Sequence, residues 1–226
     1  MTNSKKQWLS YCIDENTPLY GGRSENFNMF KTSSIKDGKV ANDSRLETTV
    51  HLGTHVDMPY HFYEDGQTVD DFDIDFWFFN KPLFVELKPD NYVIKNELIN
   101  LLENVEDDNY DILIVKTGLC ACRGEKQYWE ENYGFAPEIY DYLIDKFPTI
   151  KVFGFDSISI SSWQNRDLGK VSHKAFLNPK KPILILEDID LNNISSDMKL
   201  KSIIVSPLRI KNCDGLPCTV IGEFHE

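Results

Sequence analysis

The sequence predicts a single domain of the α/β or mostly β class that spans residues 1–226. Strand-like and helix-like segments alternate along the chain, and no linker or low-complexity tract separates them. The hydrophobic content of 41% and the charged content of 27% are ordinary for a globular protein. A chain of 226 residues can also bury a large core, so one domain is sufficient to account for its length.

The expected strands are short apolar or alternating runs, whereas the expected helices carry apolar residues three and four positions apart. Ile112 to Lys116 is an apolar run suited to a buried strand, and Lys95 to Asn104 has helical spacing. Further strands are expected at residues 7–13, 45–50, 81–87, 152–155, 183–187, 202–210 and 219–223, and further helices at residues 127–132 and 138–147. The polar segment 17–44 is predicted to be a loop that contains a short strand pair at most.

The most informative feature for function is a concentration of histidine. The chain has 5 histidines, and His51, His55 and His61 lie in one short run together with Asp57. Imidazole and carboxylate groups are the ligands that a borderline or hard divalent metal prefers. The run therefore favours a metal-dependent enzyme, and a purely structural cluster of polar side chains is the alternative.

The spacing within this run requires a bend in the chain. A fully extended segment would hold the Cα atoms of His51 and His55 about 13 Å apart, which His–metal bonds of about 2 Å can hardly close. Gly53 stands where the bend is needed, and glycine adopts tight conformations without steric cost. Pro59 and the surrounding β-branched residues argue against a helix. We therefore expect a strand that enters a tight bend, followed by a loop through Pro59 to His61.

The overall charge and the cysteine pattern exclude several classes of protein. The net charge of −12 leaves no basic field for nucleic acid and fits poorly with binding to anionic membranes. No apolar stretch approaches the roughly 20 residues that span a bilayer, and residues 1–8 lack the apolar core of a signal peptide. The 5 cysteines have no framework spacing, so we expect reduced thiols and a cytoplasmic enzyme. Cys120 as a nucleophile has no activating group nearby in the sequence.

The run from His51 to His61 resembles the His-x-Gly-Thr-His-x-Asp-x-Pro-x-His signature of the cyclase family, which includes bacterial kynurenine formamidase (arylformamidase) and isatin hydrolase. Every fixed position of the signature is filled. Weaker resemblances extend over most of the chain, at residues 154–157, 172–177, 183–187 and 205–210. The resemblance implies an α/β domain with a mostly β core and flanking helices, of the swivelling β/β/α type.

The resemblance also implies a ligand set. By this resemblance two divalent ions bind per chain, with Zn²⁺ the first choice and Mn²⁺ the alternative. One ion would be held by His51, His55 and Asp57. Asp57 would bridge to a second ion held by His173, which the sequence places near a helix start, and Glu187 would contact both. His61 would be the general acid/base. His225 has no role in this scheme and is expected to be exposed.

The reaction expected from the resemblance is metal-dependent hydrolysis of a small amide, of the arylformamidase type. The substrate would be a small aromatic amide or lactam, and the enzyme a homodimer or homotetramer. Formamidase relatives carry a Pro-x-Trp-Pro-Gly-Asp segment that lines the substrate pocket, and this chain has Pro18-Leu-Tyr-Gly-Gly-Arg23 instead. Tyr20 is a candidate for stacking on an aryl ring. Arg23 is either a ligand for a substrate carboxylate or an ordinary surface residue.

Two alternatives remain open from the sequence. One is another reaction of the cyclase family, such as lactam or lactone hydrolysis or a polyketide-type ring closure. The other is a non-catalytic binding protein that keeps the fold. The second is disfavoured because every expected ligand and His61 are present in the chain.

Overall fold

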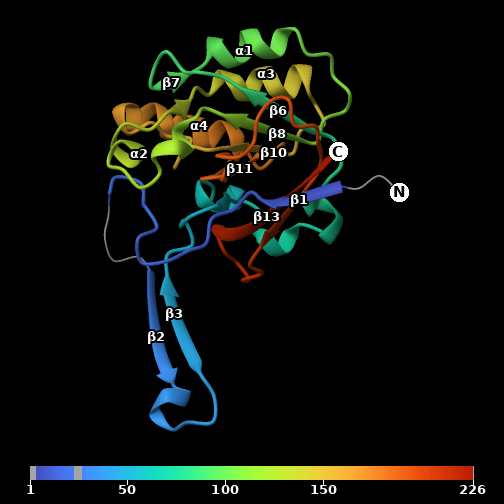
Figure 1. Ribbon diagram of the computed structural model, residues 1–226. Helices are drawn as coiled ribbons and strands as arrows, with labels where there is room; N and C mark the ends of the chain where they lie inside the picture. Colours follow the sequence, from blue (N-terminus) through green and yellow to red (C-terminus); the bar gives the residue numbers. More distant parts are fainter. Residues whose placement is uncertain (1–3, 23–26, 226) are drawn as a thin grey trace.

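A computed structural model describes residues 4–22 and 27–225 of the protein (Figure 1). Its main sheet has the strand order β5-β12-β13-β4-β11-β10-β8-β6, and β1 pairs with β13 beside this path. The strands of this sheet are β1 (Ser4–Trp8), β4 (His55–Asp57), β5 (Phe78–Phe79), β6 (Pro82–Glu86), β8 (Ile112–Lys116), β10 (Val152–Phe155), β11 (Leu184–Glu187), β12 (Leu200–Pro207) and β13 (Gly215–His225).

Two small sheets, four α-helices and six short 3₁₀ helices complete the described part of the chain. The small sheets are β2 (Phe27–Ser33) with β3 (Asp43–Thr48), and β7 (Val93–Ile94) with β9 (Gly134–Phe135). The helices are α1 (Asn96–Glu103), α2 (Gln127–Glu130), α3 (Glu138–Lys146) and α4 (Arg166–Phe176). None of the helices in residues 4–22 and 27–225 combines the length and the apolarity needed to cross a lipid bilayer.

The main sheet joins a parallel half to an antiparallel half, and β4 is the strand at the junction. Strands β6, β8, β10 and β11 pair in parallel. Strand β4 is antiparallel to β11 on one side and to β13 on the other. The three residues of β4 are therefore held from both edges at the centre of the sheet.

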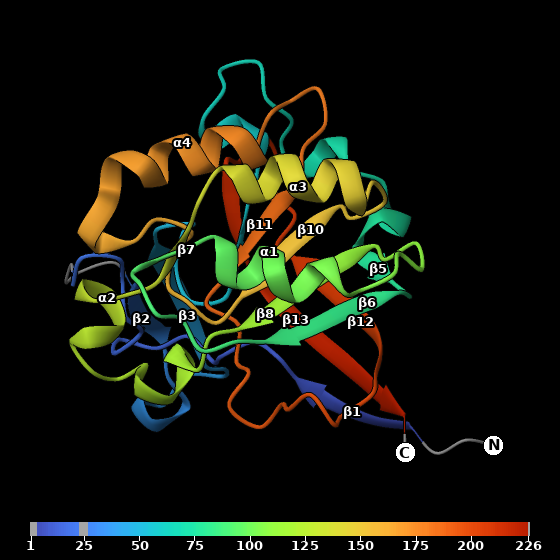
Figure 2. The ribbon, with the colours of Figure 1, turned by 90° about the horizontal axis from the view of Figure 1, so that it is seen from above.

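Side chains alternate along the parallel strands and contribute to two separate cores. Leu113, Phe153 and Ile185 pack under the helices, with apolar residues of α1, α3 and α4. Figure 2 shows these three helices covering one face of the sheet. Ile114 and Leu186 point to the opposite face, where they pack against apolar residues of β12 and β13. The cores thus form two layers, one on each side of the parallel strands.

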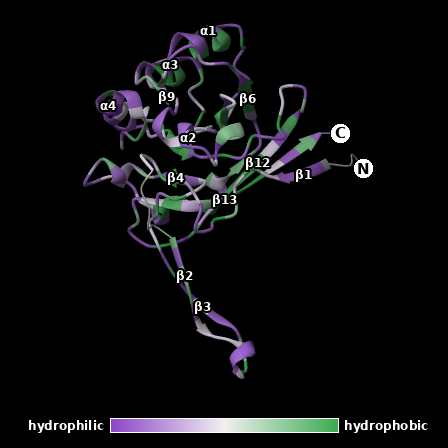
Figure 3. Cartoon of the chain, turned by 60° about the vertical axis from the view of Figure 1, so that its left-hand side comes forward, coloured by the Kyte–Doolittle hydropathy of each residue, from purple (hydrophilic) through white to green (hydrophobic). Residues whose placement is uncertain are grey.

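The hairpin β2–β3 stands apart from both layers. It projects away from the body in Figure 1 and is drawn largely in hydrophilic colours in Figure 3. Its two strands pair only with each other, from Phe27 opposite Thr48 to Ser33 opposite Asp43. We call residues 27–48 the arm.

Most of the expected elements are confirmed, and β8 and β10 have the predicted bounds. The first strand is shifted, since β1 is Ser4–Trp8 rather than 7–13. The predicted helix 127–132 is only the single turn Gln127–Glu130. The strand expected at residues 45–50 ends at Thr48 and belongs to the arm, so it does not lead the main sheet into the bend.

The helix α4 was not among the helices expected from the sequence. Its buried residues are Gly169, Ser172, His173 and Phe176, so its inner face is mostly small and polar. His173 lies in the last turn of this helix, and the expectation of a position near a helix start is wrong. The placement matters because the end of α4 lies over β11, where the candidate ligands converge.

Candidate metal centre

The register of β4 brings three of the expected residues to one face of the sheet. Glu187 at the end of β11 is paired with His55, and Ile185 is paired with Asp57. Paired residues of neighbouring strands point to the same face. Ile185 belongs to the core under the helices, so His55, Asp57 and Glu187 point to that side as well. His173 reaches them from the last turn of α4.

The bend before β4 is at Gly53, as the spacing predicts. Gly53 has a φ of +61°, in the left-handed region that favours glycine. The carbonyl oxygen of Gly53 lies 2.8 Å from Nδ1 of His55. Thr54 donates its hydroxyl hydrogen to the carbonyl of Asp188, the residue after Glu187. The bend is thereby tied directly to the strand that carries Glu187.

Asp57 is the centre of the cluster. Its Oδ1 lies 2.8 Å from Nδ1 of His51 and 3.4 Å from Nε2 of His55. Its Oδ2 lies 3.5 Å from Nε2 of His173. The side chain is only 1% exposed, so all of these contacts are made away from water. One buried carboxylate therefore faces three imidazole rings.

Glu187 forms the second carboxylate of the cluster. Its Oε2 lies 3.4 Å from Nε2 of His55, and its Oε1 lies 3.8 Å from Nε2 of His173. Oε1 also accepts hydrogen bonds from the backbone N–H of Ile160 at 2.7 Å and from the hydroxyl of Ser159 at 3.2 Å. These two donors, which the sequence did not single out, fix the direction of the carboxylate.

The rings of His55 and His173 are oriented in the same way. Nδ1 of His173 lies 2.9 Å from the carbonyl oxygen of Gly169, as Nδ1 of His55 does from that of Gly53. An Nδ1–H that donates to a carbonyl fixes the tautomer in which Nε2 carries the free lone pair. Both Nε2 atoms face the two carboxylates, which is the arrangement expected of metal-ligating histidines.

Asp214 is a member of the site that sequence reasoning missed. Its Oδ2 lies 2.9 Å from Nε2 of His51 and 3.1 Å from Nδ1 of His61. It directly precedes β13, whose first residue, Gly215, is paired with Asp57. A Cβ at Gly215 would lie 2.5 Å from Cε1 of His51, so the close approach of His51 requires glycine there. An aspartate before a glycine carries no motif that would have identified it.

The electrostatic environment shifts the pKa values of the two buried carboxyl groups in opposite directions. Burial opposes the charge on Asp57, but the surrounding His51, His173 and His55 hold the pKa of this carboxyl well below its usual range. Burial and the charge on Asp57 together raise the pKa of Glu187 to about 7. In the absence of a metal, Asp57 is thus an anion at neutral pH, while Glu187 exchanges a proton there.

The pKa values of His51 and His61 are also shifted in opposite directions. Burial would lower the pKa of His51, but the adjacent Asp57 and Asp214 outweigh it and raise this pKa to about 9. Burial lowers the pKa of His61, with His51 and His173 acting in the same direction and Asp57 opposing them. His61 is therefore the ring in the group that is held neutral near pH 7.

These residues line one cavity of about 310 Å³. Tyr20 forms part of its wall, and the tyrosine ring packs edge-on against Trp163 with the centroids 5.3 Å apart. The hydroxyl oxygen of Tyr20 is buried and has no hydrogen-bond partner among the described residues. Arg23, the other residue considered for substrate contact, lies outside the described residues.

The structure thus brings together the seven residues that were singled out for the site and that lie in the described part of the chain. His51, His55, Asp57, His61, His173, Glu187 and Tyr20 all line the cavity. His225 is exposed at the end of β13, as expected. The cysteines are free thiols, and burial beside Asp156 raises the pKa of Cys120, which disfavours a nucleophilic thiolate there.

Comparison with known proteins gives the fold and the family. The curated relatives include cyclase-like protein 2 of Arabidopsis thaliana, 27% identical over 199 residues (85% of this chain and 69% of that protein). They also include the kynurenine formamidase of Bacillus cereus, 28% identical over 192 residues (84% of this chain and 83% of that protein). Among solved structures, isatin hydrolase A from Labrenzia aggregata, bound to benzyl benzoate, superposes with a TM-score of 0.80 at 17% identity and covers 99% of this chain and 94% of its own.

The structural similarity to isatin hydrolase A confirms the expected α/β fold with its β core and flanking helices. The family model described as "Putative cyclase" matches residues 8–162, more than half of the chain, and this range includes the run from His51 to His61. The chain belongs to this Cyclase family.

Proposed function

We propose that the protein is a metal-dependent hydrolase that cleaves the C–N bond of a small amide, with an aromatic amide of the arylformamidase type as the first candidate. The expected catalytic unit is the whole chain, residues 1–226. The cavity of about 310 Å³ suits a small molecule and is at the lower end of ligand pockets in proteins.

The observation that carries the proposal is the pair of buried carboxylates. Asp57 is 1% exposed and Glu187 is 3% exposed, and both face imidazole rings. None of the described residues that line the cavity is a lysine or an arginine. Buried carboxylates are stable when they are paired or coordinate a metal. Imidazole nitrogens and carboxylate oxygens within 4.8 Å of one another meet this requirement for a divalent cation.

The residues fit the metal that the resemblance implies. His51, His55 and Asp57 would hold one ion, His173 would hold a second that shares Asp57, and Glu187 would contact both. Zinc is the first choice and manganese the second, because both accept nitrogen and carboxylate oxygen ligands. When bound, such a metal lowers the pKa of a coordinated water and polarises a carbonyl oxygen.

The chain's own residues would supply the remaining steps. Nδ1 of His61 donates to Asp214, so Nε2 is the atom that accepts and returns a proton. In amide cleavage this nitrogen would accept a proton and deliver it to the leaving amine. Tyr20 would stack on an aryl group of the substrate and present its unpaired hydroxyl as a hydrogen-bond donor.

The family relatives support the class of reaction more strongly than the particular substrate. One is named kynurenine formamidase and another isatin hydrolase, and each name states a reaction on a small aromatic molecule. The identities of 28% and 17% leave room for a different leaving group. Opening of a lactam or lactone is the second candidate, because the same cavity and the same proton carrier would serve it.

The test has two parts. Protein purified without chelator should contain a divalent metal by elemental analysis, and stripped protein should take up zinc or manganese in a calorimetric titration. The loaded protein should then hydrolyse at least one of N-formylkynurenine, simple formanilides, isatin and aryl esters. A protein that binds neither metal would refute the ligand set. A loaded protein inactive on the whole panel would shift support to ring closure or to ligand binding without catalysis.

A further inference from the structure

Asp188 directly follows Glu187 and has an unusual backbone conformation. Its φ is +53°, in the left-handed region that residues other than glycine seldom adopt. Among the described residues, Asn109 and Asn212 share this conformation, and both are exposed, whereas Asp188 is 1% exposed. A strained conformation persists inside a protein only where its surroundings determine it, and such residues gather at functional sites. The contacts of Asp188 therefore indicate what its conformation serves.

Main-chain hydrogen bonds tie Asp188 to the segments beside the end of β11. Its N–H donates to the carbonyl oxygen of Ser157, just after β10, at 2.9 Å. Its own carbonyl oxygen accepts the hydroxyl hydrogen of Thr54, the residue before β4. The same hydroxyl oxygen accepts the N–H of Tyr11 at 3.2 Å, which fixes its direction. The backbone of Asp188 thus joins the end of β10 to the start of β4.

The side chain of Asp188 is held by two residues from outside the sheet. Arg123 donates from Nε to Oδ1 at 2.8 Å and from a terminal nitrogen to Oδ2 at 2.6 Å, and the hydroxyl of Tyr128 donates to Oδ1. Arg123 follows the 3₁₀ helix Leu119–Cys122, and Tyr128 belongs to α2, which lies beside the sheet in Figure 2. The guanidinium carbon also lies 3.8 Å from the centre of the Tyr11 ring. We call Arg123 and Tyr128 the clamp of Asp188.

The clamp also keeps a third carboxylate out of the ligand set. Asp188 lines the cavity next to Glu187, but both of its oxygens are engaged by the clamp. Stability alone is a weak reason for such a pair, because replacing a buried ion pair with well-packed apolar residues is often neutral or stabilising. Orientation of a neighbouring ligand is a reason that apolar side chains do not supply.

We propose that Asp188 is a positioning residue for the metal centre. The clamp holds its backbone in the left-handed conformation, and this backbone sets the end of β11 against the start of β4. Glu187 and His55 are paired at this point, with Oε2 and Nε2 3.4 Å apart. A turn of Asp188 out of the left-handed region would displace these two groups from each other. The inference rests on the proposed metal-dependent function.

The test compares Asp188→Ala with Asp188→Gly. Both changes remove the carboxylate and release the clamp, but glycine adopts the left-handed conformation without steric cost and alanine does not. In a calorimetric titration the alanine variant should bind Zn²⁺ about 10–100-fold more weakly than the glycine variant, the usual effect of a change behind a metal ligand. The absorption spectrum of the Co²⁺-loaded protein should stay close to that of the wild type in the glycine variant only. A role confined to the ion pair predicts equal affinities and equal spectra.

A second measurement needs no metal. The N–H of Ile160 donates to Oε1 of Glu187 at 2.7 Å, so its amide resonance in an NMR spectrum reports the position of this carboxylate. In metal-free protein the resonance should shift in Asp188→Ala and stay close to that of the wild type in Asp188→Gly. A wild type that binds neither zinc nor manganese would refute the proposed function, and the Ile160 resonance would then decide the inference by itself.

The matched control makes the same two changes at Asn109, an exposed residue with a φ of +58° between α1 and β8. Asn109→Ala and Asn109→Gly should both bind Zn²⁺ as the wild type does. Because the Asp188 changes leave Arg123 buried without its partner, the pair is also made in an Arg123→Met background, where no buried charge is left unpaired. Equal zinc affinities together with equal Ile160 resonances in the alanine and glycine variants of Asp188 would overturn the proposal.

Discussion

Asp214 and His61 are joined by a contact of 3.1 Å between Oδ2 and Nδ1, and the same oxygen lies 2.9 Å from Nε2 of His51. A proposed proton carrier and a proposed metal ligand thus share one anchoring oxygen. The anchor comes from the residue before β13, and His51 and His61 flank β4. The geometry of the two rings therefore depends on the pairing of β13 with β4.

Replacing His61 with alanine should separate proton transfer from metal binding. If His61 carries the proton, turnover should fall by roughly 10²–10⁴, the usual contribution of one general acid/base. Metal content measured by elemental analysis should stay near that of the wild type. The control is His225→Ala, an exposed residue far along β13, which should change neither quantity. Loss of metal in the His61 variant would instead make His61 a ligand.

Replacing Asp57 with asparagine should, in contrast, reduce metal binding itself. Asp57 faces three imidazole rings, so its charge is the common counterpart of the whole cluster. We expect metal occupancy to fall and activity to be lost with it. Metal titration followed by calorimetry gives the change in affinity. An affinity equal to that of the wild type would argue against Asp57 as a ligand.

Replacing Asp214 with asparagine should impair catalysis while the fold is kept. The change removes the negative charge that orients His61 and His51, and outer-shell changes of this kind cost about 10–100-fold. The hydrogen bond to Asp214 raises the pKa of His61, so its loss should move the acidic limb of the kcat/KM profile to lower pH. The measurement is the pH profile of the variant against that of the wild type. An unchanged profile would contradict the proposed role of His61.

The metal-free protein should become less stable as the pH rises from about 6.5 to 9.5. The pKa of His51 is raised to about 9 in the folded state, so its contribution is fully present below its unfolded pKa and is lost as the pH rises through 9. Glu187, raised to about 7, acts in the same direction at lower pH. His61 acts oppositely, but only below its ordinary pKa.

Thermal unfolding of chelator-treated protein across this range measures the effect. The variant His51→Gln should show a flatter dependence of the melting temperature on pH, because it removes a group whose pKa is raised to about 9 in the folded state. A wild-type melting temperature that increases from pH 6.5 to 9.5 would contradict the assignment.

Arg123→Met should destabilise the protein without touching the candidate ligands. Arg123 donates to Asp188 through Nε at 2.8 Å and through a terminal nitrogen at 2.6 Å, and Asp188 is 1% exposed. Removing one partner of a buried ion pair costs about 3–5 kcal/mol, because the other charge is left unpaired. Denaturant unfolding measures the loss.

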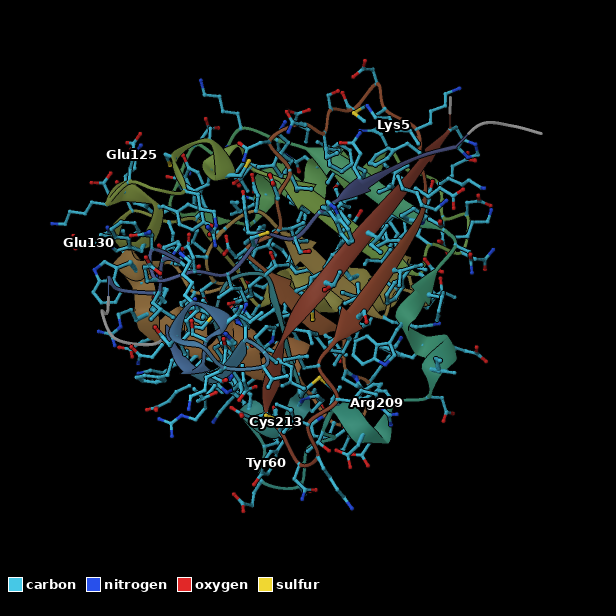
Figure 4. The ribbon with its side chains drawn as sticks, turned by 60° about the horizontal axis from the view of Figure 1, so that its bottom comes forward. Lys5, Tyr60, Glu125, Glu130, Arg209 and Cys213 are labelled. Carbon is cyan, nitrogen blue, oxygen red and sulfur yellow. The ribbon has the colours of Figure 1, made fainter. Side chains whose placement is uncertain are left out.

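The control for this variant is Lys126→Met. Lys126 forms an exposed ion pair with Glu130 in α2, at the outer margin of the molecule (Figure 4). Exposed pairs contribute about 0–1 kcal/mol, so this change should be close to neutral. Equal losses in the two variants would mean that the buried pair makes no special contribution.

The core of the site could be predicted from the sequence because its chemistry lies in one short run. His51, His55, Asp57 and His61 are neighbours along the chain, and the Gly53 bend follows from the reach of an extended strand. The strands β8 and β10 could also be predicted from the sequence, since an apolar run of four or five residues is a strong local signal.

The features that could not be predicted from the sequence depend on contacts that no local pattern of residues records. The helix α4 buries Gly169, Ser172 and His173, so few large apolar side chains mark its inner face in the sequence. Asp214 reaches the site only through the pairing of β13 with β4, which no local pattern records. The arm was expected to be a loop with a short strand pair at most, and its paired strands are mostly exposed, so they carry little of the burial that a hydrophobic pattern reports.

The position of β4 between β11 and β13 has a consequence for how such an enzyme can evolve. His55 and Asp57 are fixed by the register of both neighbouring strands, whereas Tyr20 lies on a connecting segment before the arm. Mutations in residues 18–20 can reshape the wall of the cavity without replacing any proposed ligand. Selection for a new substrate can therefore act on that segment alone, while the reactive groups are inherited unchanged from the sheet.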